Sequence, residues 1–436
     1  MNAKILILGA GKSATVLIQY LQKKAIENNW YITLADSDIN LAEKKWNKAK
    51  NGHAIAFDIN DPILRSAQIE SHSIVVSMLP AALHFLVAKD CLKHNKSLFT
   101  ASYVDENLNA IASEIKEKKL LFLCEMGLDP GIDHMSAMQL VHRIQNMGGV
   151  ITEFKSHCGG LIAPESDNNP WHYKISWNPR NIILAGKTGA LFLEDGKQVE
   201  KKYETLFSNV PNIEIANIGT LSYYPNRDSI SYINTYDLKS ATNFVRTTLR
   251  NPRFMYGWNA IVKLGLTSEN SIIRKDTDSI KTWFEMHIQN QNLTYELQQI
   301  LLDKILKNQF EYLDLKSNKI IPLELNSNAS ILQWILEDKW KLSESDKDMV
   351  VMMHEITYEL KNTTHKIQSS MVVIGTDSTY TAMAKTVGLP LAMGVCAYLK
   401  GEIILTGLQI PTHPSIYNPI LKTLAEEGIV FEEKNR

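Results

Sequence analysis

The sequence lacks the features that mark nucleic-acid-binding, membrane and secreted proteins. Its 46 lysines and arginines nearly balance its 47 aspartates and glutamates, so a net charge of −1 gives no basic surface for a polyanion. We find no apolar run approaching the roughly 18 residues of a transmembrane helix. The chain also enters an apolar strand too early for a signal peptide. We therefore expect a cytoplasmic protein with neither a nucleic-acid nor a membrane partner.

Cysteine is scarce, and its spacing excludes the usual roles of paired thiols. The cysteines are Cys91, Cys124, Cys158 and Cys396, far apart and without CxxC spacing. We expect reduced thiols and no bound metal. Cys158 stands out because two glycines follow it and would let a ligand approach the backbone. Covalent catalysis by Cys158 is disfavoured, because the adjacent His157 would point to the other face of a strand and could not act as its base.

The chain begins with a short apolar strand, Lys4–Leu8, that leads into a glycine turn and then a helical pattern. This is the context that a dinucleotide-binding turn requires. Gly9 permits the tight turn, Gly11 lets backbone N–H groups approach a pyrophosphate, and Ala14 allows close packing of helix on strand. A glycine turn without a cofactor is the alternative. The residues expected to bind the cofactor here are Gly9, Ala10, Gly11, Lys12, Ser13 and Ala14.

Residues 1–130 alternate between buried-strand and amphipathic-helix patterns. The expected strands are Lys4–Leu8, Tyr31–Ala35, His53–Phe57, Ser73–Ser77, Ser97–Thr100 and Leu120–Cys124. The expected helices between them include Leu41–Lys50, Ala82–His94 and Glu106–Lys118. This alternation predicts an α/β fold built on a Rossmann-type, doubly wound parallel sheet.

From about residue 148 the pattern changes to longer alternating strands, which predict an α+β substrate domain with an antiparallel sheet. The expected strands are Val150–Ser156, Ile213–Ile218 and Ile230–Leu238, with Arg246–Arg250 in a loop or helix. A small helical insertion over about 270–345 is expected to contain Ser279–Gln289, Tyr295–Lys307 and Ala329–Trp340. A hairpin of Met349–Leu360 and Lys366–Ile374 follows, then helices at Ser378–Val387 and Asn418–Glu427. The expected domains are therefore 1–130, 131–270 with about 345–375, and about 270–345.

Asp36 ends the second expected strand and bears on the choice of cofactor. A carboxylate here can accept hydrogen bonds from the adenosine ribose and would repel the 2′-phosphate of NADP. The alternative, a helix N-cap in Asp36-Ser-Asp-Ile, can coexist with this role. NAD is therefore preferred over NADP. If NADP is used as well, a basic side chain such as Lys44 or Lys45 must reach its phosphate.

Loops after the fourth, fifth and sixth strands meet at the sheet edge where ligands bind in this fold. They offer Tyr103, Asp129, Asp133 and His134, the kinds of group that proton transfer beside a nicotinamide needs. Taken singly, each has a structural explanation. Tyr103 could be a core phenol, Asp133 a helix N-cap and His134 a first-turn residue. Their convergence favours a catalytic site.

Three longer motifs carry a family resemblance. Gly127-Leu-Asp-Pro-Gly-Ile-Asp-His134, Cys158–Glu165 and Tyr224-Pro-Asn-Arg-Asp-Ser229 closely resemble the L-glutamate-forming saccharopine dehydrogenase family. The resemblance covers nearly the whole chain and is weakest over about 270–345. It implies reversible conversion of saccharopine to glutamate and 2-aminoadipate 6-semialdehyde with NAD or NADP, in lysine metabolism. It also implies a homodimer, and a C-terminal segment, about 375–436, that returns to the dinucleotide domain.

The resemblance also implies site residues. Substrate contacts fall on Tyr103, Val104, Asp129, Cys158, Arg227, Thr248, Leu249 and Arg250. Cofactor contacts fall on the glycine turn and on Asp36, Asp58, Ile59, Leu79, Ala101, Ser102, Gly127, Leu128 and Trp177. Asp129 is expected to be the principal acid/base group, with Tyr103 as its hydrogen-bonding partner or proton relay. Fungal members that use NADP carry an arginine after the second strand, where this chain has Asp36-Ser-Asp38.

Two alternative functions remain open from the residues. A carboxynorspermidine dehydrogenase-like reductase would need fewer carboxylate-binding arginines than Arg227 and Arg250. For either arginine a surface ion pair is an alternative role. A non-catalytic NAD-binding regulator would keep the glycine turn but would have lost Tyr103, Asp129 and Arg227, and all three are present.

Overall fold

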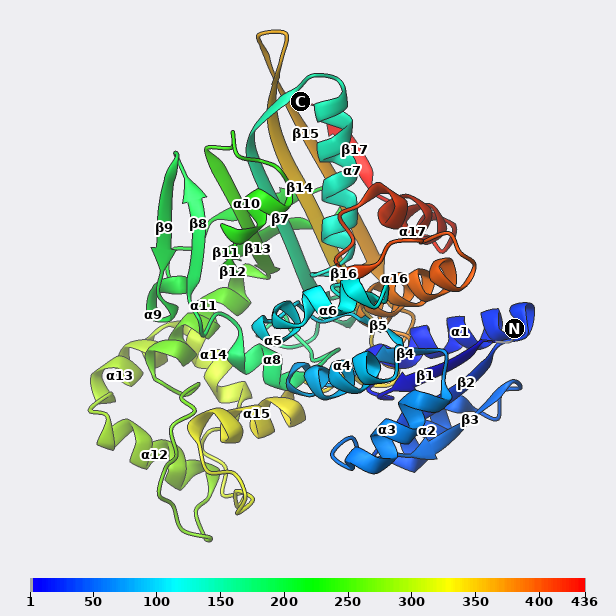
Figure 1. Ribbon diagram of the computed structural model, residues 1–436. Helices are drawn as coiled ribbons and strands as arrows, with labels where there is room; N and C mark the ends of the chain where they lie inside the picture. The colour runs from blue at the N-terminus through cyan, green and yellow to red at the C-terminus, as the bar shows by residue number, and fades with distance from the viewer. Residues whose placement is uncertain (1–2, 436) are drawn as a thin grey trace. The chain divides into compact units, whose positions relative to one another are not determined.

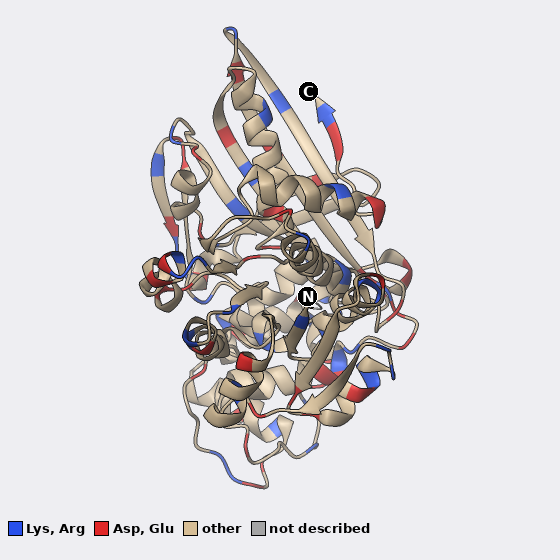
Figure 2. Cartoon of the chain, turned by 45° about the vertical axis from the view of Figure 1, so that its right-hand side comes forward, with Lys and Arg blue, Asp and Glu red and all other residues tan. Residues whose placement is uncertain are grey.

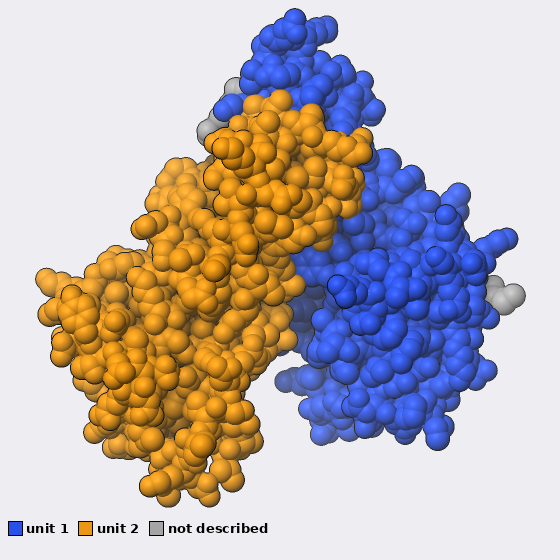
Figure 3. Space-filling model, turned by 60° about the vertical axis from the view of Figure 1, so that its left-hand side comes forward, with its two compact units in different colours: residues 1–151, 358–436 blue, residues 152–357 orange. Residues whose placement is uncertain are grey.

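Seven parallel strands form the first sheet (Figure 1). The N-terminal glycine turn follows the strand Lys4–Leu8 of this sheet. The computed structural model describes residues 3–435. The chain separates into two compact units, residues 1–151 with 358–436 and residues 152–357 (Figure 3). Charged residues of both signs are scattered over the helices, strands and loops of the chain (Figure 2). The three-part division expected from the sequence stays a prediction.

The strand order of the first sheet confirms the predicted doubly wound fold. In spatial order the strands are β16 (Gly407–Gln409), β6 (Leu121–Leu123), β5 (Ser97–Thr100), β4 (Ile74–Ser77), β1 (Lys4–Leu8), β2 (Tyr31–Asp36) and β3 (Gly52–Ala56). The order reverses between β1 and β4, and ligands of such sheets bind at the carboxyl ends of the strands beside that point. The edge strand β16 was not predicted. It pairs with β6 in parallel, Leu408 opposite Phe122.

Helices cover both faces of this sheet, so the residues from Ile5 to Leu8 are completely buried. The helices of this unit are α1 (Thr15–Asn28), α2 (Ile39–Trp46), α3 (Pro62–Ser71), α4 (His84–Lys93), α5 (Glu106–Ala110), α6 (Ala112–Glu117), α7 (Ile132–Asn146), α16 (Ala382–Leu399) and α17 (Pro414–Glu426). The unit also contains the antiparallel pair β15 (Thr363–Ile374) and β17 (Glu432–Asn435).

Helix α16 corrects the expectation about apolar runs. This helix of 18 residues is long and apolar enough to cross a membrane, judged by length and composition alone. Most of that length, 78%, is buried inside the structure, as in the core helix of a soluble protein. It packs closely on α1, because a Cβ at Gly388 would lie 2.8 Å from the backbone nitrogen of Leu17.

The second unit is built on a mixed sheet and not on the purely antiparallel sheet that was expected, because some of its strands pair in parallel. Its strands are β7 (Val150–Ile162), β8 (Ala190–Glu194), β9 (Lys197–Lys201), β10 (Asn212–Ile215), β11 (Gly219–Pro225), β12 (Arg227–Asp228), β13 (Asn243–Arg250) and β14 (Asp348–Leu360). Within this sheet the order β10-β11-β13-β7-β14 sets β13 antiparallel to β11 and parallel to β7. That register places Thr248 opposite Cys158. The chain passes between the units within β7 and β14.

Helices follow and interrupt these strands around one aromatic core. They are α8 (Pro179–Leu184), α9 (Tyr203–Leu206), α10 (Ser231–Thr235), α11 (Pro252–Lys263), α12 (Ile280–Asn290), α13 (Thr294–Leu302), α14 (Lys304–Tyr312) and α15 (Asn328–Lys339). Trp171, Trp258 and Trp340 are buried at the centre of this core. The expected helical segment therefore shares its core with the part of the unit that precedes it.

Two predictions for the second unit are wrong. Residues Ile230–Leu238, expected as a strand, contain α10 instead, because the Asp228 carboxylate accepts hydrogen bonds from the N–H groups of Ile230 (2.7 Å) and Ser231 (3.2 Å). Conversely, Arg246–Arg250, expected as a loop or helix, lies in strand β13. Its arginines are buried, so the polar residues that suggested a loop lie inside the unit.

Several helices also differ from expectation, and the one expected over Glu106–Lys118 is divided at Ile111 into α5 and α6. The single helix expected over Tyr295–Lys307 is divided at Asp303, whose carboxylate caps α14 through the N–H groups of Ile305 and Leu306. Helix α16 begins after its N-cap Thr381 and continues to Leu399, well beyond the expected Ser378–Val387. Pro390 lies within it, so the proline does not end the helix.

Candidate functional site

The glycine turn after β1 has the backbone geometry that a dinucleotide needs. Gly9 has a φ of 101°, and a Cβ there would lie 3.0 Å from the carbonyl oxygen of Met78. At Gly11 a Cβ would meet nothing within 4 Å, so the backbone is open on the side where phosphates approach. One 3-10 turn, Lys12–Ala14, then leads directly into α1. The turn therefore fits a nicotinamide dinucleotide.

Asp36 ties the end of β2 to this turn. Its carboxylate accepts hydrogen bonds from the N–H groups of Ala10 at 2.6 Å and Asp38 at 2.9 Å. The alternative interpretation, in which Asp36 is a helix N-cap, is wrong for α2. The cap is Asp38, which accepts from Asn40 and Leu41. Asp36 thus lies where a ribose-binding carboxylate is expected in this fold.

Lys45 on α2 approaches the same turn. Its ammonium group donates hydrogen bonds to the carbonyl oxygen of Gly11 and, at 2.9 Å, to Thr15 Oγ1. Burial lowers the pKa of Lys45 to about 8, although the charge of Asp36 acts in the opposite direction. Of the two lysines considered from the sequence, Lys45 is the one that reaches the cofactor turn.

The loops after β3 and β4 carry the next predicted cofactor residues. Asp58 accepts from Asn60 N–H at 2.9 Å in a local turn, and the carbonyl of Ile59 accepts from Arg65. Leu79 packs at the edge of the core of this unit. These placements are compatible with cofactor contacts but leave those roles as predictions.

His84, which was not among the predicted site residues, joins two of the edge loops. Its ring nitrogens lie 2.8 Å from Ser77 Oγ and 2.6 Å from Ser102 Oγ. Burial lowers the pKa of His84 to about 4, so the ring is neutral at physiological pH. The only sequence signal was a histidine within the apolar pattern of the expected helix Ala82–His94.

The structure brings Tyr103 and Asp129 together. The Tyr103 hydroxyl donates a hydrogen bond to Asp129 Oδ1 at 3.3 Å. The two loops adjoin because Met126 N–H donates to Thr100 O, and a Cβ on Gly127 would lie 3.1 Å from Ala101 Cβ. Predicted contacts Ala101, Ser102, Gly127 and Leu128 therefore lie along the same two loops.

Two further acids surround the turn that carries Asp129. Glu125 accepts from Val104 N–H at 3.1 Å and pairs with His134 Nε2 at 2.7 Å. Asp133 accepts from Gly131 N–H at 2.6 Å. The prediction that Asp133 is the N-cap of the following helix is wrong, because Gly131 holds that position and Asp133 lies in the first turn. Glu125 itself was missed as part of this arrangement.

The second unit contains a buried arginine, Arg250. Arg250 is 5% exposed and lies over the rings of Tyr173 and Phe254, with its guanidinium carbon 5.4 and 5.8 Å from their centroids. Its NH1 donates to the carbonyl of Leu249 at 2.8 Å. Within the described part of the chain it has no carboxylate partner. Buried charges are normally paired, so an anion is the partner expected from outside the chain.

The other predicted residues of this unit lie on or near the same strands. Cys158 and Thr248 are opposite each other, and Thr248 hydrogen-bonds the phenol of Tyr224, whose pKa is raised chiefly by burial. Arg227 is exposed, with a φ of 48°, and its charge acts on Tyr224. Trp177 donates from Nε1 to Tyr173 Oη at 3.2 Å. Their proposed contacts with ligands stay predictions.

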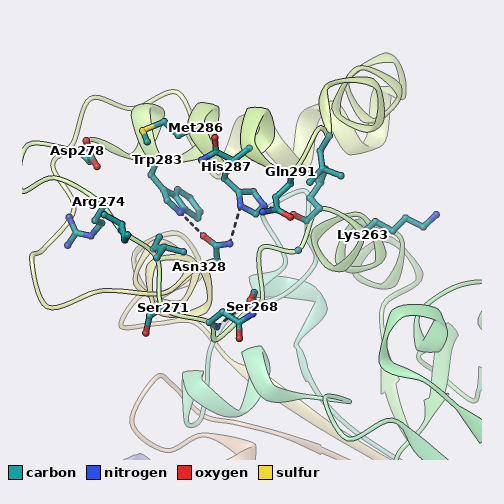
Figure 4. A pocket seen from close by; sticks show the side chains of 17 residues that line it. Lys263, Ser268, Ser271, Arg274, Asp278, Trp283, Met286, His287, Gln291 and Asn328 are labelled. Carbon is teal, nitrogen blue, oxygen red and sulfur yellow. Dashed lines mark hydrogen bonds between the residues drawn. The ribbon is translucent and has the colours of Figure 1, made fainter.

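A cavity of about 430 Å³ lies elsewhere in this unit, between α11, α12 and the start of α15 (Figure 4). Its polar side chains bond one another. Trp283 Nε1 donates to Asn328 Oδ1 at 2.9 Å, and the Asn328 amide lies 3.1 Å from His287 Nδ1. The described side chains that line it include none of the predicted substrate or cofactor contacts. Residues 3–435 contain no group of three or more histidine, cysteine or acidic side chains that could hold a metal ion.

Comparison with known proteins gives the family. The saccharopine dehydrogenase NADP binding domain matches residues 5–123, and the saccharopine dehydrogenase C-terminal domain matches residues 127–429. The chain belongs to the saccharopine dehydrogenase family. The enzyme "Saccharopine dehydrogenase [NADP(+), L-glutamate-forming]" of Schizosaccharomyces pombe is 30% identical, over 99% of this chain and 98% of its own length.

A solved structure and a mammalian relative extend this result. The apo saccharopine dehydrogenase (L-Glu forming) of Saccharomyces cerevisiae superposes with a TM-score of 0.89 at 29% identity and covers all of both chains. The mitochondrial alpha-aminoadipic semialdehyde synthase of Mus musculus is 31% identical over 99% of this chain, which spans 48% of that longer protein.

The comparisons confirm several predictions made from the sequence. The chain is an NAD(P)-dependent oxidoreductase, and its function as an L-glutamate-forming saccharopine dehydrogenase in lysine metabolism is confirmed at the level of the family. Its substrates are small molecules. This function replaces the two alternatives, the carboxynorspermidine dehydrogenase-like reductase and the non-catalytic regulator.

Proposed function

We propose that the reaction of this family, oxidation of saccharopine to glutamate and 2-aminoadipate 6-semialdehyde, proceeds here through Asp129 and Tyr103. The observation that carries the proposal is the 3.3 Å hydrogen bond between them at the carboxyl ends of β5 and β6. Both strands belong to the sheet that holds the glycine turn at the end of β1. A carboxylate with a phenol beside it is therefore available near the position where the fold places a nicotinamide.

The cofactor would be held by the glycine turn, Asp36 and the loops of Leu79, Ala101 and Gly127. When bound, the nicotinamide accepts the hydride that leaves the substrate carbon. We infer that NAD is preferred, because the Asp36 carboxylate suits a free ribose and repels a 2′-phosphate. The ammonium of Lys45 beside Gly11 supports additional use of NADP.

Asp129 acts first as the base and then as the acid of the reaction. The bridging secondary amine of saccharopine must be neutral before hydride leaves, and Asp129 accepts its proton. Loss of hydride leaves a protonated imine, which takes up water and releases one proton. As the carbinolamine collapses to the aldehyde, its nitrogen takes up the proton held by Asp129 and the proton of the carbinolamine hydroxyl, and the amine leaves as glutamate. Tyr103, which donates to Asp129, stabilises the carboxylate form and can relay the proton.

Arg250 and Arg227 recognise the carboxylates of the substrate, of which saccharopine has three. Support for Arg250 is strongest, because its buried charge has no carboxylate partner among the described residues. Cys158, which lies opposite Thr248, lines the pocket and does not act as a nucleophile. Fixing which end of the substrate faces the nicotinamide lowers the barrier by positioning alone.

We further infer a cytoplasmic homodimer. The four cysteines are free and buried, as in proteins of a reducing compartment. The homodimer rests on the family resemblance.

The reaction is tested with purified protein and saccharopine, with NAD and NADP in parallel, by the absorbance of the reduced nicotinamide. We expect turnover with both cofactors, a higher kcat/KM with NAD, and glutamate as a product. Equal or better kcat/KM with NADP contradicts the cofactor preference. Absence of glutamate contradicts the proposed reaction.

A further inference from the structure

Glu125 contacts the chain on both sides of Tyr103. Its backbone N–H donates to the carbonyl of Ser102 at 3.0 Å, and its Oε1 accepts from Val104 N–H at 3.1 Å. These two bonds bracket the residue whose phenol reaches Asp129. Glu125 therefore fixes the local path of the loop that presents Tyr103.

The other carboxylate oxygen of Glu125 reaches the far end of the Asp129 turn. Oε2 lies 2.7 Å from Nε2 of His134, which is completely buried in the first turn of α7. The turn over residues 127–131 is closed by the bond from Gly127 N–H to Pro130 O at 2.9 Å. Glu125 thus joins the loop of Tyr103 to the base of the turn that carries Asp129.

The burial of the Glu125 side chain has an unfavourable free energy that an apolar side chain would not have. Glu125 is 4% exposed, and burying a carboxylate is unfavourable unless hydrogen bonds compensate it. A methionine or leucine of similar volume would pack there without that cost. The carboxylate instead makes one bond to the loop of Tyr103, at Val104 N–H, and one to His134 in the helix that follows the Asp129 turn.

We propose that Glu125, held by His134, is a positioning residue that sets the contact between the Tyr103 phenol and the Asp129 carboxylate. The inference rests on the proposed catalytic role of that pair. A displacement of about 1 Å at such a site costs on the order of 10²-fold in rate. Glu125 acts on turnover through Tyr103 and Asp129 and does not contact the substrate.

The test is a double-mutant cycle with Tyr103. Glu125→Ala lowers kcat by about 10²-fold and leaves the Kd of the reduced cofactor, measured by fluorescence, nearly unchanged. In a Tyr103→Phe background the same change costs much less, because the phenol that it positions is gone. Glu125→Gln, which keeps an acceptor for Val104 N–H, recovers most of the turnover.

The matched control is His72, another buried histidine of the same unit with both ring nitrogens hydrogen-bonded. It precedes β4 and therefore lies at the opposite, amino end of the sheet. His72→Leu lowers stability, and its effect on kcat is additive with Tyr103→Phe. If Glu125→Ala does not fold, His134→Leu removes the hydrogen-bond partner of Oε2 while keeping Glu125 and enters the same cycle.

A pH profile separates positioning from a general loss of structure. Losing the phenol's hydrogen bond destabilises the Asp129 carboxylate, so the acidic limb of kcat/KM moves to higher pH in Glu125→Ala. Additive losses with Tyr103→Phe, or an unmoved limb, overturn the positioning role. If Tyr103→Phe and Asp129→Asn both turn over normally, the proposed catalytic pair fails instead, whatever Glu125 does.

Discussion

The ammonium group of Lys45 lies 2.9 Å from Thr15 Oγ1, beside the glycine turn and with its pKa lowered to about 8. The half-buried cation also lies close enough to Asp36 for that carboxylate to act on its pKa, and this is the side of the turn where the 2′-phosphate of NADP is expected. An arriving phosphate favours the charged amine, so binding raises the pKa of Lys45.

Lys45→Met should therefore lower the affinity for NADP. Losing a charge-assisted partner worth about 1.5–3 kcal/mol corresponds to roughly 10- to 10²-fold. NAD should be affected much less. In the wild type, NADP binding should weaken as pH rises through about 8, because the free protein then loses the proton on Lys45. Fluorescence titrations at several pH values measure this, with the exposed Lys44→Met as the control. Equal losses with both cofactors would instead show a contact with the shared pyrophosphate.

Asp129→Asn should abolish most turnover. The amide keeps the size of the side chain but cannot accept the proton of the amine, so kcat should fall by ~10²–10⁴-fold with little change in NAD binding. The comparison variant is Asp133→Asn, which keeps an acceptor for Gly131 N–H and should cost stability rather than catalysis. Steady-state kinetics and thermal unfolding of both proteins decide the assignment. A reversed pattern would mean that the two acids have been exchanged.

Arg250→Met should raise the KM for saccharopine by roughly 10- to 10²-fold while the affinity for NAD stays the same. Methionine keeps much of the packing against Tyr173 and Phe254, so the loss reports the missing charge. The neighbouring exposed Arg253→Met is the control and should behave like the wild type. A variant that binds saccharopine normally would remove Arg250 from the substrate site.

His84 should make stability depend on mildly acidic pH. Its pKa is lowered from 6.5 to about 4 in the folded protein. Between these two pH values the unfolded chain therefore binds a proton at His84 that the folded protein does not bind. The stabilisation is complete above about pH 6.5 and is lost as pH falls towards 4, by about 3 kcal/mol in total. Urea unfolding at several pH values across this range gives the free energy of unfolding. The slope of that free energy against pH should be shallower for His84→Gln. An unchanged slope would show that His84 is charged in the folded state.

The first sheet could be predicted because each of its central strands is a short apolar run between helices, buried on both faces. The same reasoning brought Tyr103 and Asp129 to one edge. It failed where a single polar side chain decides the structure, as when Asp228 turns the apolar residues after it into α10. It also failed for β13, whose arginines are buried, and for β16, which is three residues long and defined by its partner β6. Contacts such as Glu125 with His134 depend on the folded loops and leave no local pattern.

Strand β16 and helix α16 complete the nucleotide-binding unit with residues that come after the whole of the second unit. During synthesis, α1 leaves the ribosome long before the helix that covers it, and β6 remains an open edge until residues 407–409 arrive. The ability to bind a dinucleotide should therefore appear only after residues 382–409 have been synthesised. A nascent chain stopped before α16 would expose apolar surface and a free sheet edge, which are the features that chaperones recognise and that promote aggregation.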